Sequence, residues 1–156
     1  MKRVKGNLID LAEAGEFDII VHGCNCFCTM GGGIAREIRS RCPQAWEVDC
    51  ETVSGDINKL GTYTVGLNNG GTYLIANAYT QFKMSHVGED VFEYASFEVI
   101  LRKLAHSEGK CRFGFPMIGM GLAGGDSNRI IKMLEDFSVE VASKGGSVTL
   151  VEFEKS

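Results

Sequence analysis

The pattern of apolar and polar residues predicts the same order of elements, a strand, a loop and a helix, in two stretches of the chain. Residues 17–22 form a continuous run rich in β-branched side chains, typical of a strand covered on both faces of a sheet. Gly31-Gly32-Gly33 then precedes residues 34–41, whose apolar positions recur on one helical face, and Pro43 limits how far this helix continues. The first stretch therefore predicts a central strand, a glycine loop and a helix.

A second strand, loop and helix are predicted in the C-terminal half. Residues 111–115 have the composition of a strand, which Pro116 ends. Residues 119–125 form a second glycine-rich loop, and residues 127–142 have the pattern of a helix. Residues 147–153 then supply a last strand, so both halves of the chain contain the same kind of unit.

Between these units lie two short β-rich runs and one more helical pattern. Residues 62–67 and 72–79 flank Asn68-Asn69-Gly70-Gly71, which is a strong hairpin signal, and residues 91–106 carry apolar side chains at helical spacing. Alternating strands and helices with one hairpin predict an α/β fold. We expect one domain, residues 1–156, with three α/β/α layers and a mixed, mostly parallel central sheet. A ligand site is expected where loops leave the strand ends.

Composition and charge narrow the possible ligands. The chain has 20 glycines and only two prolines in 156 residues, with no Gly-x-y period, so we expect the glycines in turns and ligand loops. A formal net charge of −4 argues against bulk nucleic-acid binding, although backbone amides can still hold a phosphate. No apolar run approaches the roughly 18 residues that span a membrane. We expect a monomeric cytoplasmic protein that binds a small molecule.

Six cysteines occur without a signal peptide, which favours reduced thiols over disulfides. Cys24, Cys26 and Cys28 alternate after His22, so a zinc site is one possible interpretation. No second pair of cysteines or histidines completes a recognisable zinc pattern. The alternative, which we favour, is buried thiols at a strand end with no metal or other cofactor.

Both glycine loops have the form of a phosphate-binding loop. Glycines before a helix N-terminus offer free amides without a Cβ, and the helix dipole adds roughly 0.3–1 kcal/mol. Neither loop matches the Walker pattern, and residues 119–124 follow G-x-G-x-x-G in spacing only. Either loop alone could be a tight turn, but together they could hold a diphosphate from two sides.

Three polar residues beside these loops are candidates for chemistry. His22 titrates near neutral pH and could transfer a proton, but it could equally be a core histidine. Asn25 could bind sugar hydroxyls. Asp126 could act as a base or orient water, or could cap the helix that follows. His86 and His106 receive no role.

Four segments of the chain resemble macrodomains. They are residues 19–26 (IIVHGCNC) and 30–35 (MGGGIA), with the opening 4–9 (VKGNLI) and the second loop 116–122 (PMIGMGL). The histidine at position 22 makes the resemblance closest to the small phosphatases that act on ADP-ribose 1″-phosphate. The resemblance implies that His22 is catalytic and that Asp126 is a possible helper.

The resemblance also implies how the ligand is held. Asn7 and Leu8 would lie at the adenine end, and Asn25 would meet the distal ribose. The residues expected to cradle the diphosphate are Gly31, Gly32, Gly33 and Ile34 from the first loop and Gly119, Met120, Gly121, Leu122 and Ala123 from the second.

Two departures from the family pattern affect these expectations. Many macrodomains use an aspartate to accept the adenine amino group, whereas this chain has Asn7, which is a neutral acceptor. Related hydrolases use a lysine and an aspartate at positions that align with Asn77 and Ala123. The alternatives to the phosphatase are an ADP-ribosyl hydrolase acting on protein or nucleic acid, and a binding module without activity.

Overall fold

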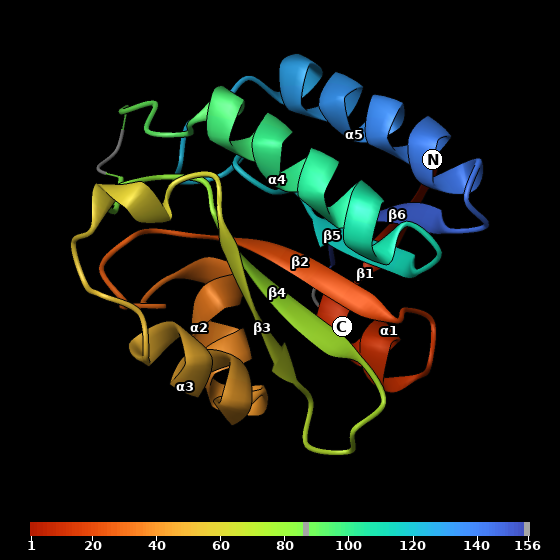
Figure 1. The fold of residues 1–156 in the computed structure, drawn as a ribbon, viewed down its shortest axis with the longest axis horizontal. Helices are drawn as coiled ribbons and strands as arrows, with labels where there is room; N and C mark the ends of the chain where they lie inside the picture. Colours follow the sequence, from red (N-terminus) through yellow and green to blue (C-terminus); the bar gives the residue numbers. More distant parts are fainter. Residues whose placement is uncertain (86–87, 155–156) are drawn as a thin grey trace.

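The computed structural model describes residues 1–85 and 88–154 and contains one six-stranded sheet (Figure 1). The strand order is β1-β6-β5-β2-β4-β3. Only the β3–β4 pair is antiparallel, and every other neighbouring pair is parallel. The mixed, mostly parallel sheet is therefore confirmed. The strands are β1 (Lys2–Gly6), β2 (Ile19–Cys24), β3 (Tyr63–Leu67), β4 (Leu74–Tyr79), β5 (Arg112–Pro116) and β6 (Ser147–Phe153).

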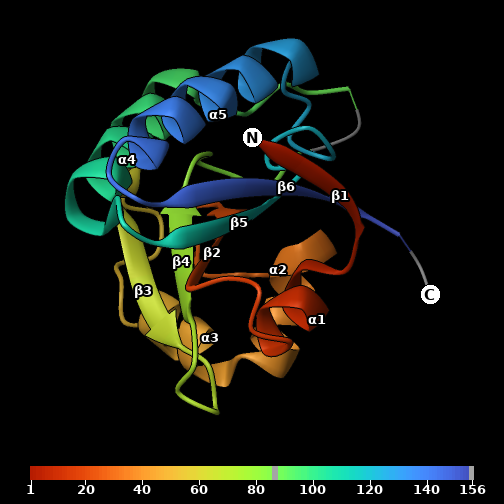
Figure 2. The same ribbon diagram turned by 90° about the vertical axis from the view of Figure 1, so that its right-hand side faces the viewer.

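Helices cover both faces of this sheet, as Figures 1 and 2 show. Helices α4 and α5 lie side by side on one face, while α1, α2 and α3 lie on the other. The three-layer arrangement expected from the sequence is thus confirmed. The helices are α1 (Leu8–Glu13), α2 (Gly33–Arg41), α3 (Pro43–Cys50), α4 (Tyr94–Glu108) and α5 (Ser127–Ala142), with a 3₁₀ turn, η1, at Ile57–Lys59.

Strand β2 is central because its side chains are buried on both faces of the sheet. It pairs with β4 on one side and with β5 on the other. Ile19 and Val21 belong to the core under α4 and α5, whereas Ile20 belongs to the core under α1 and α2. This alternation follows from the two-residue period of a strand.

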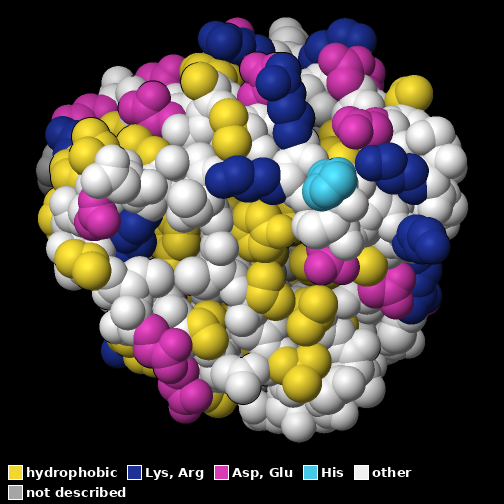
Figure 3. Space-filling view, viewed as in Figure 1, with side chains coloured by type: hydrophobic (Ala, Val, Ile, Leu, Met, Phe, Trp, Pro, Cys, Tyr) yellow, Lys and Arg dark blue, Asp and Glu magenta, His cyan; other side chains and the backbone are white. Residues whose placement is uncertain are grey.

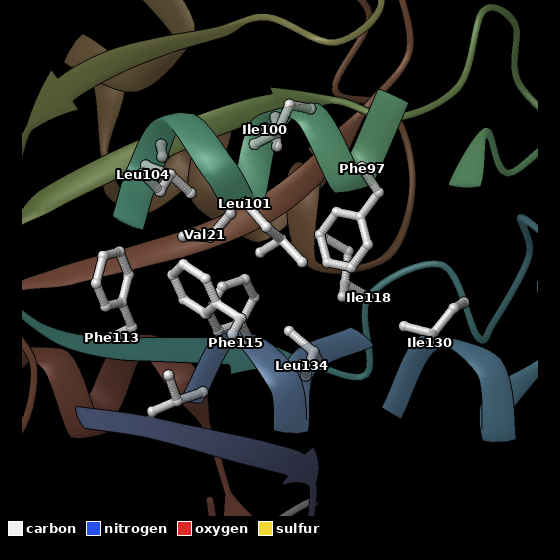
Figure 4. Packing of buried hydrophobic residues seen from close by; sticks show 14 of the residues in the cluster. Val21, Phe97, Ile100, Leu101, Leu104, Phe113, Phe115, Ile118, Ile130 and Leu134 are labelled. Atoms are coloured by element: carbon white, nitrogen blue, oxygen red, sulfur yellow. The ribbon is translucent and has the colours of Figure 1, made fainter. Parts of the chain in front are cut away.

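The core under α4 and α5 anchors the second glycine loop. Phe113 and Phe115 pack edge-to-face on Phe137, with ring centroids 5.1 and 5.8 Å apart. Ile118 and Ile130, which precede and follow the loop, are buried in the same cluster (Figure 4). The loop is therefore fixed to the core at both ends.

Two helices were not predicted from the sequence. Pro43 was expected to limit the preceding helix, and α2 does end at Arg41. Pro43 is also the first residue of α3, a position where a missing amide hydrogen costs nothing. The short helix α1 begins after Asn7, whose side chain accepts a hydrogen bond from the Asp10 amide.

Candidate functional site

A cavity of about 250 Å³ lies between the two glycine loops, beyond the carboxyl ends of β2 and β5. This is the position expected for a ligand site in an open α/β sheet. The first loop and the start of α2 line it with Asn25 and residues 30–35, and the second loop lines it with residues 116–119 and 121–123. The remaining lining residues are Gly23, Cys24, Asp49, Gln81, Met84 and Ser85.

The Asn25 side chain forms two hydrogen bonds within the first loop. The Asn25 side chain accepts a hydrogen bond from the Phe27 amide at 2.8 Å and donates one to Thr29 Oγ1 at 2.7 Å. Gly33 has a φ of +54°, a conformation that favours glycine. Gly32 is the N-cap of α2 and supplies no side-chain hydrogen bond. The first amides of α2 are therefore available to an anion in the cavity.

The second loop is closed by backbone hydrogen bonds and needs glycine at its base. The Gly125 amide donates to the Gly119 carbonyl at 2.8 Å. Gly119 has a φ of +73°, and a Cβ there would overlap the Phe92 ring. A Cβ at Gly121 would meet no atom within 4 Å. The base of the loop is thus packed tightly, while its tip is open.

The structure brings most of the sequence-predicted ligand residues to this one cavity. Met120 does not line it but packs against the core under α4 and α5. Asn7 and Leu8 also lie outside its lining. Asn7 caps α1 and donates to Glu37 Oε1 of α2 at 3.2 Å, and Leu8 is buried. The predicted residues that do line it are Asn25, Gly31, Gly32, Gly33, Ile34, Gly119, Gly121, Leu122 and Ala123.

His22 is placed differently from the sequence expectation. Its side chain is fully buried and does not line the cavity, because β2 continues two residues beyond it to Cys24. The Nε2 atom donates to Asn77 Oδ1 on the neighbouring strand at 2.7 Å. Burial lowers the pKa of His22 from 6.5 to about 4, so the ring is neutral at pH 7. This position favours the core-histidine interpretation over proton transfer to a ligand.

Asp126 also lies outside the lining of the cavity. It is exposed and is the N-cap of α5, where its side chain accepts a hydrogen bond from the Arg129 amide at 3.2 Å. The capping alternative is therefore the arrangement observed.

Asp49 is a cavity residue that sequence reasoning missed. It is only 1% exposed, and it is the one charged side chain among the described residues that line the cavity. Tyr79 Oη donates to Asp49 Oδ1 at 2.7 Å, while burial raises the pKa of this carboxyl. Asp49 lies on α3, a helix that the pattern did not predict, so no local signal pointed to it.

The cysteines near the cavity are unpaired thiols. All six cysteines are free, and burial raises the pKa of Cys24 well above its usual value. Across residues 1–85 and 88–154, no group of three or more His, Cys, Asp or Glu side chains is placed to hold a metal ion. The zinc interpretation therefore gains no support from the described residues. His86 lies outside them.

The surface over the helices carries charges of both signs. Figure 3 shows lysine and arginine side chains interspersed with acidic ones over the helices at the top of the view. Among the described helices, none combines the length and apolar character that crossing a bilayer requires.

Comparison with known proteins shows which family this chain belongs to. No family model matches it. An uncharacterized 17.5 kDa protein from the tk-vs intergenic region of Enterobacteria phage T4 is 33% identical over 145 residues, which cover 88% of this chain and 90% of the phage protein. The chain belongs to the family of this phage protein.

Solved structures show which fold this chain has. A protein of unknown function from Bacteroides thetaiotaomicron matches with a TM-score of 0.78 and 19% identity, covering 97% of this chain and 96% of that one. The macrodomain of Thermus aquaticus DarG matches at 0.70 and 19% identity, over 99% and 97% of the two chains. A Trypanosoma brucei macrodomain in complex with ADP-ribose matches at 0.67 and 16%, over 98% and 63%. The chain has the macrodomain fold.

Proposed function

We propose that the cavity of this macrodomain binds an ADP-ribose-type ligand, with the diphosphate between the two glycine loops. The observation that carries the proposal is the uncapped start of α2, which faces the second loop across the cavity. Solved structures of the same fold contain ADP-ribose, in the Trypanosoma brucei macrodomain and in Thermosipho africanus DarTG. The loops and the fold thus support the same ligand class.

Backbone amides are the main anion-binding groups in this proposal. No lysine or arginine occurs among the described residues that line the cavity. Free amides and the dipole of α2 therefore supply the positive field for the phosphates. A volume of about 250 Å³ is below the roughly 300–1,000 Å³ of typical ligand pockets. The cavity accordingly holds the diphosphate and distal ribose, and the adenine extends toward Asn7 and Leu8.

The proposed reaction is hydrolysis of ADP-ribose 1″-phosphate to ADP-ribose and phosphate. His22 takes no part in the chemistry of this proposal, because its buried ring is hydrogen-bonded to Asn77 and neither residue lines the cavity. Asp126 enters it as a helix cap. Water attacks the phosphorus, the ester P–O bond breaks, and the departing ADP-ribose oxygen takes up a proton that the water releases. The amides of the loops stabilise the negative charge on the phosphate during this step.

Binding and reaction are tested by separate measurements. Calorimetry with ADP-ribose tests binding in the wild type, Gly121→Val and Gly70→Ala. A Cβ at Gly121 would meet no atom within 4 Å, so the valine side chain fits beside the cavity without a clash and should weaken binding at least ~10-fold by occupying ligand space. Gly70 lies in the β3–β4 turn and does not line the cavity, so its alanine variant should bind like the wild type. Equal affinity in all three proteins would contradict the proposed site.

The reaction is tested by measuring released phosphate from ADP-ribose 1″-phosphate. Release that is lost in Gly121→Val supports the phosphatase. Release of ADP-ribose from a modified protein or nucleic acid, without phosphate release, would replace the phosphatase with an ADP-ribosyl hydrolase. If the protein bound ADP-ribose but released neither phosphate nor ADP-ribose from these substrates, it would be a binding module, and the proposed reaction would be wrong.

A further inference from the structure

The buried carboxylate of Asp49 has one oxygen with a protein partner and one without. Tyr79 donates to Oδ1, and Tyr79 in turn receives a hydrogen bond from Thr64 Oγ1 at 3.0 Å. No described residue donates a hydrogen bond to Oδ2. Lys59 is also buried, but its Nζ atom donates to the Cys26 carbonyl at 3.1 Å and forms no ion pair with Asp49. Asp49 therefore presents an unused acceptor at the cavity.

Asp49 lines the cavity although the residue is only 1% exposed. A hydrogen-bond donor that enters the cavity can therefore use the free carboxylate oxygen. The ionised carboxylate can only accept hydrogen bonds, and it repels phosphate. The matching ligand group is thus an uncharged donor, such as a sugar hydroxyl.

The first loop fixes where this acceptor lies. Cys28 Sγ donates to the Asp49 carbonyl at 3.2 Å, and Thr52 Oγ1 donates to the same carbonyl at 2.6 Å. Asp49 is therefore tied to the segment that follows Asn25, a residue that lines the same cavity. Because Tyr79 holds Oδ1, the carboxylate is oriented before a ligand arrives.

We propose that Asp49 Oδ2 accepts a hydrogen bond from a hydroxyl of the ligand's distal ribose. Asp49 is then a specificity residue, which favours ADP-ribose over nucleotides that end at the β-phosphate. This inference rests on the proposed function, because it takes the diphosphate to lie between the glycine loops.

Calorimetry with two ligands tests the contact. ADP lacks the distal ribose, so it reports on the adenosine and diphosphate contacts alone. Asp49→Ala should weaken ADP-ribose binding about 10- to 100-fold, the range for hydrogen bonds to charged groups, and should leave ADP binding within twofold. Glu47→Gln removes one negative charge from the exposed side of the same helix and should change neither affinity.

Asp49→Asn is a second test, for the case in which Asp49→Ala fails to fold. The asparagine oxygen must accept from Tyr79, which turns its amide group toward the cavity and removes the acceptor from the hydroxyl. It should therefore give a smaller loss in the same direction, selective for ADP-ribose. Unchanged ADP-ribose affinity, or equal losses for both ligands, in a variant that melts cooperatively would overturn the inference. If the wild type binds neither ligand, the proposed function itself fails.

Discussion

Replacing His22 with glutamine removes a titrating group that is buried in the folded protein. The pKa of His22 falls to about 4 because burial penalises the charged ring, whereas the unfolded chain binds a proton at about 6.5. Between these values the unfolded state holds more protons, so acid favours unfolding. The stabilisation from neutral His22 is complete above pH 6.5 and is lost as the pH falls toward 4.

The size of this effect follows from the two pKa values. Each pH unit between the two pKa values removes about 1.4 kcal/mol, and pH 4.5 lies about two units below the unfolded-state pKa. Lowering the pH from 8 to 4.5 should therefore remove about 2.5 kcal/mol of unfolding free energy through His22 alone. This is a large share of the roughly 5–15 kcal/mol that stabilises a typical domain.

Urea unfolding followed by circular dichroism at several pH values measures this loss. Other groups titrate in the same range, so the relevant quantity is the difference between the wild type and His22→Gln. The variant is expected to lose about 2.5 kcal/mol less between pH 8 and pH 4.5. If the unfolding free energies of the two proteins fell equally with pH, His22 would not be buried and neutral in the folded protein. It would then be an accessible proton donor again.

Two further variants test other positions. Asp126→Ala removes the cap of α5 and should cost about 1 kcal/mol of stability in urea unfolding, with ADP-ribose affinity within twofold. A larger loss of ADP-ribose affinity would show that Asp126 contributes to ligand binding. Gly66→Ala should destabilise by about 1–3 kcal/mol, because its Cβ would lie 2.7 Å from the Ala45 Cα of α3. Gly70→Ala is its control, and equal stability of these two glycine variants would contradict the packing of β3 on α3.

Local patterns predicted the elements that frame the cavity. The apolar run before Gly23 became β2, and the two glycine loops occupy the expected strand ends. The hairpin was also predictable, because Asn68-Asn69-Gly70-Gly71 is a local turn signal and the turn lies between β3 and β4. These features depend on residues that are close in sequence.

The orientation of His22 depends on contacts that the local pattern does not contain. A two-residue period places His22 on the same face of β2 as Ile20. That face is covered by α2 and α3, and Asn77 there donates to the Ala45 carbonyl of α3. Because the local pattern predicts that Pro43 ends a helix and does not predict that it begins α3, neither this cover nor the cavity position of Asp49 follows from it.

The central claim is that the two glycine loops hold a diphosphate. A crystal structure of the protein with ADP-ribose tests this most directly. We predict density for the diphosphate between residues 31–34 and 119–123, with phosphate oxygens within hydrogen-bonding distance of the first amides of α2. ADP-ribose bound at another surface, or absent from the cavity at saturating concentration, would contradict the account.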